Sequence, residues 1–245
     1  GVQTCALPIY LSHYFNSCMA INAAHMSALG DILNDKDLSF QYKKMYFSLK
    51  TRINSLMWDN ETGFYHDLDK NEARLPQQTI AGFWPLLAEL PNADRADVLI
   101  AHLSNSQTFG TDHPFPTLSA DSPDFKESGE GFKGSVLAPF NFMVIKGLEK
   151  YQRYAFAREC AIRHLYYILE ALSPVDSKQK GDLYEAYLPC KEGPAACRSD
   201  SEFPKRRYLH YTGLSTIALM IENVIGLNIS LPRKTVDWVI PNLEI

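Results

Sequence analysis

One carboxylate flanked by aromatic side chains is the feature of this sequence best suited to chemistry. Glu185 lies in the segment 181–189, which reads GDLYEAYLP, between Tyr184 and Tyr187. Pyranose rings stack on aromatic faces, and rings that restrict water around a carboxylate favour its action as an acid or a base. The alternative is a loop glutamate that caps the next element or lies in solvent. The pattern indicates a candidate site for binding and processing a sugar.

A second candidate contact region follows a glycine-rich approach. The run Gly129-Glu130-Gly131 precedes Phe132 and Lys133, and glycines permit a ligand to come close to the backbone. We expect Phe132 to offer a ring and Lys133 a positive charge to a sugar.

Three more residues have expected roles of different kinds. Trp84, in the run GFWP, is either a stacking platform or a buried core residue, whereas Tyr211 is expected to be an aromatic residue of the cleft. Asp182 follows Gly181 and is expected to order the turn through its own backbone.

The histidines do not have the spacing of a metal site. His102 and His113 lie eleven residues apart across a loop, and His164 is expected to lie alone on an apolar helix. No pair has the i, i+4 spacing of a helical zinc motif, and no cysteine supports one. The sequence predicts no metal and no cofactor.

The composition limits the partners. The 245 residues are 46% hydrophobic and 21% charged with a formal charge of −4, which gives no basic stripe for a nucleic acid. No run approaches the roughly 18 apolar residues of a membrane span. We therefore expect neither nucleic acid nor a membrane as a partner, and the composition indicates no compartment. Aromatic residues make up 12% of the chain, and many fall in expected loops, which is typical of a binding cleft.

The apolar spacing predicts an all-α chain in which helices follow one another in pairs. The expected helices cover 12–33, 38–58, 79–90, 95–103, 135–148, 154–172 and 212–225, and a strand is expected over 235–240. Two long connections, 107–134 and 173–211, are rich in Gly, Pro, Ser, Asp and aromatic residues. Long loops inside a helical domain are typically functional. The pattern favours a toroid of helix pairs whose long loops gather at one mouth.

The first nine residues look unlike the rest of the chain. They read GVQTCALPI, which matches the translation of a common sequencing adapter, and we expect them to be an artefact joined to a fragment of a longer protein. Among the remaining cysteines only Cys190 and Cys197 are close in sequence. Their spacing leaves both a disulfide and two free thiols open.

Several segments, in order along the chain, resemble the glycosidases of glycoside hydrolase family 63 and the mannosylglycerate-hydrolase-like group. The similar segments are 56–67 (LMWDNETGFYHD), 131–141 (GFKGSVLAPFN), 182–189 (DLYEAYLP), 210–214 (HYTGL) and 221–227 (IENVIGL).

The resemblance implies an (α/α)6 barrel that hydrolyses an α-linked glycoside with inversion. It assigns residues 10–227 to the carboxy-terminal part of the catalytic domain and 228–245 to the start of a truncated β segment. Glu185 matches the general base of the family, and an inverting enzyme also needs a general acid. That aspartate is implied upstream of these residues, so we expect the fragment to be inactive alone.

The sequence departs from the family at three positions. Phe132 and Leu137 stand where the family usually has tryptophan, and Lys133 stands where it usually has arginine. A lysine is a point charge rather than a bidentate fork. These changes leave open a carbohydrate-binding barrel without catalysis. A trehalase-like hydrolase, or an epimerase that uses His113 and His210, is also open on the same helical toroid.

Overall fold

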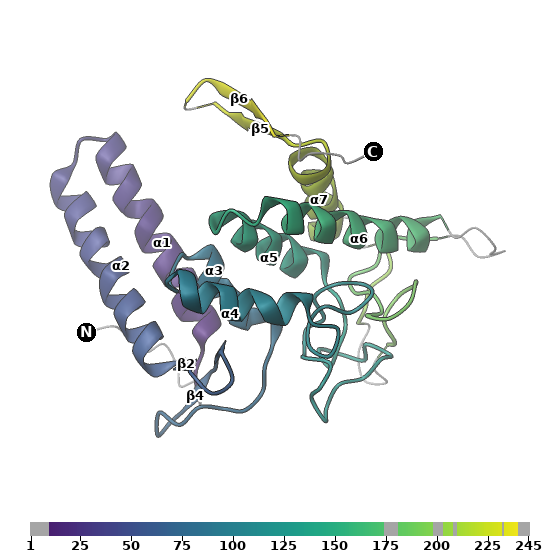
Figure 1. The fold of residues 1–245 in the computed structure, drawn as a ribbon. Coiled ribbons are helices and arrows are strands. Elements are labelled where there is room, and N and C mark those ends of the chain that lie inside the picture. The colour runs from purple at the N-terminus through teal and green to yellow at the C-terminus, as the bar shows by residue number, and fades with distance from the viewer. Residues whose placement is uncertain (1–9, 174–180, 198–202, 208–209, 232, 240–245) are drawn as a thin grey trace. The chain divides into compact units, whose positions relative to one another are not determined.

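The computed structural model describes residues 10–173, 181–197, 203–207, 210–231 and 233–239 (Figure 1). The chain divides into two compact units, Gly1–Leu99 and Ile100–Ile245. The expected adapter residues 1–9 lie outside the described residues.

The first unit is built around a long helical hairpin. Helix α1 (His13–Ile32) packs against α2 (Lys36–Leu56), and the Asp35 side chain caps α2 by accepting the amide of Leu38 at 3.0 Å. Gly30 lets the helices approach closely, since a Cβ at this position would lie 2.5 Å from the Ser39 nitrogen. The predicted hairpin is confirmed.

Short strands and one broken helix complete this unit. Strand β1 (Tyr10–Leu11) pairs with β4 (Leu68–Asp69), and β2 (Trp58–Asp59) pairs with β3 (Phe64–Tyr65), all antiparallel. The helix expected over 79–90 consists instead of a 3₁₀ turn, η1 (Ile80–Phe83), and a single α turn, α3 (Trp84–Leu87). Helix α4 (Ala93–Ser104) follows.

In the second unit a helical pair carries a third helix. Helices α5 (Ala138–Lys150) and α6 (Tyr154–Leu172) pack together, and α7 (Tyr211–Leu219) packs on α5. Helix α7 continues into a π-helical turn, η2 (Met220–Val224), which packs on α6. These helices are close to their predicted bounds because their apolar spacing is regular.

A polar cluster connects the π turn to α5. The Lys146 ammonium lies 2.7 Å from Glu222, 3.0 Å from Glu149 and 3.1 Å from the Asn223 side-chain oxygen. The Asn223 amide also donates to Glu149 at 2.7 Å. Oppositely charged and amide groups therefore hold α5 and the end of α7 together.

The chain then forms a β-hairpin. Strand β5 (Leu227–Ser230) pairs antiparallel with β6 (Thr235–Trp238), which corresponds to the strand expected from 235. Gly226 precedes the hairpin with φ of +79°, and a Cβ there would lie 2.0 Å from the Val239 carbonyl oxygen. Glycine is required at this turn.

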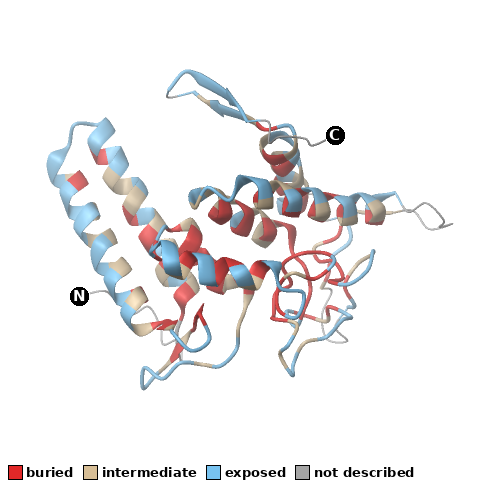
Figure 2. Ribbon diagram, viewed as in Figure 1, coloured by how far each residue is buried: buried red, intermediate tan, exposed pale blue. Residues whose placement is uncertain are grey.

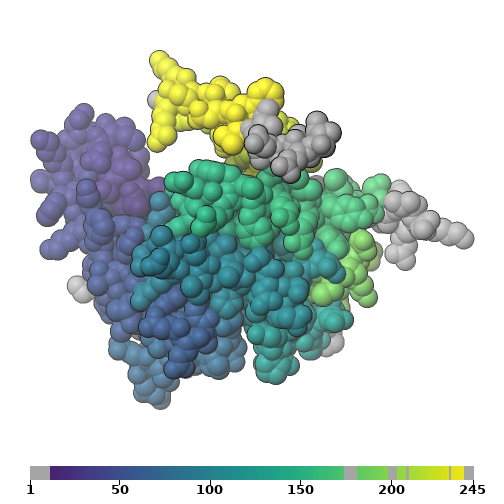
Figure 3. Space-filling view, viewed as in Figure 1, coloured from purple at the N-terminus to yellow at the C-terminus, as the bar shows by residue number. Residues whose placement is uncertain are grey.

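The two long loops of the second unit are folded into its core although they contain no named helix or strand. Figure 1 shows 107–134 in teal and 181–197 in green beside one another, and Figure 2 shows much of this region buried. In the space-filling view the green segment lies against teal atoms (Figure 3). A cluster of buried side chains underlies them: Val136, Ala138, Ile168, Ala171, Tyr184 and Tyr187. Among the described residues, no helix is long and apolar enough to span a bilayer.

Candidate active site

The segment that carries Glu185 is held by backbone hydrogen bonds on both sides. Tyr187 and Val136 exchange two amide-to-carbonyl hydrogen bonds of 2.9 Å each. On the other side, Ala195 donates to the carbonyl of Ala186 at 3.1 Å. The segment is therefore the middle strand of a small, irregular sheet-like arrangement, which fixes the backbone on either side of the glutamate.

Glu185 itself forms a reciprocal pair with Lys205. The Glu185 amide donates to the Lys205 carbonyl at 2.9 Å, and the Lys205 amide donates to Glu185 Oε2 at 3.2 Å. The side chain is half-buried, between the buried residues Tyr184 and Ala186. Oε1 makes no hydrogen bond to another described residue. One carboxylate oxygen is thus fixed by a backbone amide, while the other can accept a proton from a water molecule.

The two tyrosines that flank Glu185 lie in the core. Tyr187 is fully buried and Tyr184 is 6% exposed, with their rings edge to face at a centroid distance of 5.9 Å. The Tyr187 hydroxyl accepts the Tyr184 amide at 3.1 Å, and burial raises the pKa of Tyr187 to about 12. Both rings therefore lie in the buried cluster on which the Glu185 segment packs.

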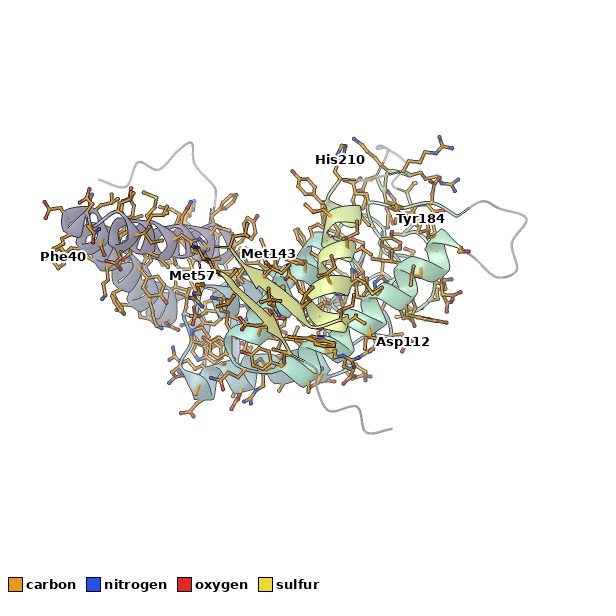
Figure 4. The ribbon with its side chains drawn as sticks, turned by 90° about the horizontal axis from the view of Figure 1, so that it is seen from above. Phe40, Met57, Asp112, Met143, Tyr184 and His210 are labelled. Atoms are coloured by element: carbon orange, nitrogen blue, oxygen red, sulfur yellow. The ribbon has the colours of Figure 1, made fainter. Side chains whose placement is uncertain are left out.

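The start of α7 is attached to the same segment. The Thr212 hydroxyl donates to the Tyr184 carbonyl at 3.0 Å. The neighbouring Tyr211 is 62% exposed, so its ring is on the surface next to the segment that carries Glu185. Figure 4 shows the labelled His210 at the beginning of this helix.

Phe132 forms an exposed aromatic platform with a residue that the sequence did not single out. Its side chain is 60% exposed, and its ring lies 5.3 Å from that of Phe203 at an interplanar angle of 33°. Phe203 in turn packs on the cluster of Leu137, Ala186 and Ala195. Phe203 therefore connects the platform to the cluster that contains Ala186, the residue next to Glu185.

The other predicted site residues lie in different environments. Lys133 is exposed and pairs with Asp124 at 3.2 Å, and Asp182 lies 3.7 Å from the Arg207 guanidinium. Trp84 belongs to the first unit, where it is 3% exposed and contacts the Tyr14 ring edge to face. Leu137 is buried at 8% exposure. Cys190 and Cys197 are both free thiols.

His164 is the single histidine of α6, but the structure pairs it with a histidine from a loop. Its Nδ1 lies 2.8 Å from Nε2 of His113, and both imidazoles are fully buried. The pair could not be found from the sequence because its members are 51 positions apart, and no local spacing connects a loop residue to one on a later helix. The buried His113 ring cannot contact a substrate, whereas His210 is exposed. The structure therefore gives no support to an epimerase that uses both histidines.

Metal-binding groups do not gather in the part of the chain that the structure describes. No three His, Cys, Asp or Glu side chains there lie close enough together to hold an ion.

Comparison with known proteins gives a consistent assignment. The model of the mannosylglycerate hydrolase MGH1-like glycoside hydrolase domain matches residues 11–203. An uncharacterized protein of Borreliella burgdorferi is 53% identical over 232 residues, which are 94% of this chain and 49% of that protein. The chain thus spans about half the length of that relative.

Solved structures agree on the fold. The family 63 mannosylglycerate hydrolase of Thermus thermophilus, in complex with Tris, superposes with a TM-score of 0.66 at 22% identity, over 84% of this chain and 44% of that one. The neutral trehalase of Saccharomyces cerevisiae gives 0.66 at 19% identity, over 86% and 37%. The helical pairs are those of the (α/α)6-barrel glycosidases. Because the family model matches most of this chain, the chain belongs to the mannosylglycerate hydrolase MGH1-like family of glycoside hydrolases.

Proposed function

We propose that this chain carries the general-base side of an inverting glycosidase that cleaves α-linked glucosides or mannosides in small saccharides or glycosyl conjugates. The observation that supports this most directly is the way Glu185 is held. Backbone hydrogen bonds fix its main chain, the Lys205 amide engages one oxygen, and the other oxygen has no hydrogen bond to another residue in the described part of the chain.

In the proposed reaction Glu185 Oε1 removes a proton from a water molecule as that water attacks the anomeric carbon. The carbon–oxygen bond to the leaving group breaks, and a general acid protonates the departing oxygen. The two carboxyl groups of an inverting enzyme stand about 6.5–9.5 Å apart, which leaves room for the water. The resemblance to the family implies an aspartate as this acid.

The aromatic platform would bind the sugar ring. Phe132 and Phe203 present adjacent exposed and partly buried rings, and Phe203 packs on the cluster that contains Ala186, next to the base. Tyr211 presents a further exposed ring at the start of α7. In this proposal Lys133 adds a positive charge beside the platform, and its pairing with Asp124 limits that contribution.

The identity of the sugar is tested by assay of the complete gene product that contains this chain. The substrates are mannosylglycerate, glucosylglycerate, trehalose, and simple α-glucosides and α-mannosides, with the released anomer followed by proton NMR. A β-anomer appearing first is expected. An α-anomer appearing first would contradict an inverting mechanism, and cleavage of trehalose alone would favour a trehalase-like enzyme.

A carbohydrate-binding barrel without catalysis is the second candidate. It is favoured by two positions near the platform: Lys133 is engaged by Asp124, and Leu137 is buried where an exposed indole would otherwise be available. Sugar affinity without release of a monosaccharide from any of these substrates would support it.

A further inference from the structure

The two buried histidines connect α6 to the segment that carries Glu185. His113 Nε2 lies 2.8 Å from His164 Nδ1, and His113 Nδ1 lies 3.2 Å from the carbonyl oxygen of Leu188. The backbone amide of His113 also donates to the Pro189 carbonyl at 2.9 Å. One residue therefore holds two consecutive buried carbonyls, three and four positions after Glu185.

These distances fix the tautomers of both rings. A carbonyl oxygen only accepts, so His113 must carry its proton on Nδ1, and a neutral His113 then has a lone pair on Nε2. That lone pair accepts a hydrogen bond from His164 Nδ1–H. The chain of donors runs in one direction, from α6 through His113 to Leu188.

The remaining atom of the pair agrees with this direction. Nε2 of His164 is buried and has no hydrogen-bond partner among the described residues. In the tautomer derived above this atom is a lone pair, and an unpaired acceptor is tolerated in a buried site more often than an unpaired N–H. The opposite tautomer would leave an unpaired N–H there.

The surroundings keep both rings neutral. Burial lowers the pKa of each, and the neighbouring Arg163 lowers that of His113 further. Arg163 itself donates to the carbonyls of Thr111 and Asp112, at 2.6 and 3.3 Å. Two aromatic rings among the described residues also contact the His113 ring: Tyr167 stacks on it at 4.9 Å and 8°, and Tyr187 meets it edge to face at 5.7 Å.

Neither a proton relay nor a metal site fits this arrangement. Both rings are fully buried, His113 uses both of its nitrogens, and a single nitrogen of His164 remains. A metal would need more ligands than that one atom. What the pair does is hold the backbone that follows Glu185.

We propose that His113 and His164 are positioning residues for the base: His164 holds His113 in the Nδ1–H tautomer, and His113 fastens the Leu188-Pro189 end of the Glu185 segment to α6. This inference rests on the proposed role of Glu185 for its catalytic consequence, but the anchoring itself can be measured without any substrate.

The anchoring is tested in this chain by amide hydrogen exchange. His164→Leu removes the donor with little change in volume, and His164→Asn keeps a side-chain N–H near the position of Nδ1. We expect exchange at the amides of Tyr187 and Leu188 to rise by about tenfold in His164→Leu, because one hydrogen bond is lost, and by much less in His164→Asn. Exchange at Ile53, in the first unit, serves as the control. Unchanged exchange at Tyr187 and Leu188 in His164→Leu would overturn the inference.

A measurement on the unsubstituted chain covers the case in which His164→Leu does not fold. Nitrogen-15 NMR of the imidazoles at pH 7 should find protonated Nδ1 and bare Nε2 on both rings. A proton on Nε2 of His113 would contradict the proposal.

The catalytic consequence is measured in the complete gene product. In His164→Leu we expect kcat to fall by about tenfold or more with little change in KM, and His164→Asn to restore most of it. Normal kcat in His164→Leu, despite faster exchange, would overturn the positioning role. If instead Glu185→Gln keeps full activity while exchange still rises in His164→Leu, Glu185 is not the base. The anchoring of the segment by His113 and His164 would still stand.

Discussion

Glu185 and Lys205 form a reciprocal pair of hydrogen bonds in which both donors are backbone amides. The Glu185 amide donates to the Lys205 carbonyl at 2.9 Å, and the Lys205 amide donates to the Glu185 carboxylate at 3.2 Å. The lysine contributes its amide rather than its charge. Every substitution except proline keeps a backbone donor, so the orientation of the carboxylate depends on the path of the chain around residue 205.

The base assignment predicts a large effect of a small change. Glu185→Gln keeps the size of the side chain and an acceptor for the Lys205 amide, but the amide oxygen cannot take a proton from water. We expect kcat of the complete gene product to fall by about 10²–10⁴-fold with substrate binding retained. Steady-state kinetics and calorimetric binding measure the two parts. The matched control is Asp182→Asn in the same segment, which should stay within a few-fold of the original rate, and a similar loss in both variants would contradict the assignment.

The aromatic platform predicts a change in binding. Phe132→Ala removes an exposed ring from its contact with Phe203, and loss of one stacked ring should raise KM about 5- to 30-fold with a smaller effect on kcat. Phe132→Trp, which keeps an aromatic face, should restore KM. An unchanged KM in Phe132→Ala would remove this ring from the sugar site.

The buried imidazoles predict a loss of stability at low pH. Burial lowers the pKa of His164 to about 3, below the ordinary value of 6.5. Below pH 6.5 the unfolded chain therefore binds a proton that the folded chain does not. The free energy of unfolding is fully present above pH 6.5 and falls as the pH decreases from there towards 3.

One such histidine lowers the free energy of unfolding by about 1.4 kcal/mol at pH 5.5 relative to neutral pH. Urea unfolding at pH 7.5, 6.5 and 5.5 measures it. His164→Asn has no titrating group at this position and should show a flatter dependence. Parallel curves for the two chains would contradict a neutral, buried His164.

The polar cluster at the π turn predicts destabilisation on loss of its cation. Lys146→Met leaves Glu149 and Glu222 close together without the charge between them, and we expect the free energy of unfolding to fall by about 1–3 kcal/mol. Lys191→Met, at an exposed position, should have little effect. Urea unfolding of the two variants measures this difference in stability. Equal midpoints would show that the cluster adds no stability.

Close packing at the end of α6 predicts that the Glu185 segment is sensitive to one methyl group. A Cβ on Gly181 would lie 2.0 Å from the Leu172 carbonyl oxygen, so Gly181→Ala must displace the chain that leads into Glu185. We expect about 1–3 kcal/mol of lost stability and a lower kcat. Gly213→Ala, whose Cβ would meet only Leu183 at 3.9 Å, is the tolerated control. Equal stability of the two variants would contradict the close contact.

The helices could be predicted from the sequence because each has its own period. The ranges expected for α1, α2, α5 and α6 agree with the structure to within about three residues at either end. The break in the expected helix 79–90 was not predictable by period, and it falls where the 3₁₀ turn ends at Phe83 and α3 begins at Trp84. Gly82 beside it packs closely on the Phe64 ring, since a Cβ there would lie 2.2 Å from that ring. Two-residue strands such as β1 and β4 have no period to detect.

The site could be predicted only in part, for a related reason. The family 63 glycosidase resemblance and the local pattern single out Glu185, but its partner Lys205 is twenty residues away, and the platform partner of Phe132 is Phe203. Contacts of this kind depend on how loops fold on each other. The roles of Glu185, Phe132, Lys133, Tyr184, Tyr187, Tyr211 and Trp84 in binding or catalysis remain predictions.

The π-helical turn at Met220–Val224 has a consequence for how this region varies by insertion and deletion. A π turn contains about one residue more than an α turn, and each residue of an α-helix turns the chain by about 100°. Because the wider turn takes up the extra residue, a single-residue deletion here would return the helix to α geometry and leave the later side chains in nearly the same orientation. Deletion of Glu222 or Asn223 itself would remove one of the partners of Lys146. Homologous chains one residue shorter at this point would therefore keep the direction of the segment that follows, and a set of homologous sequences would display this length difference at the π turn.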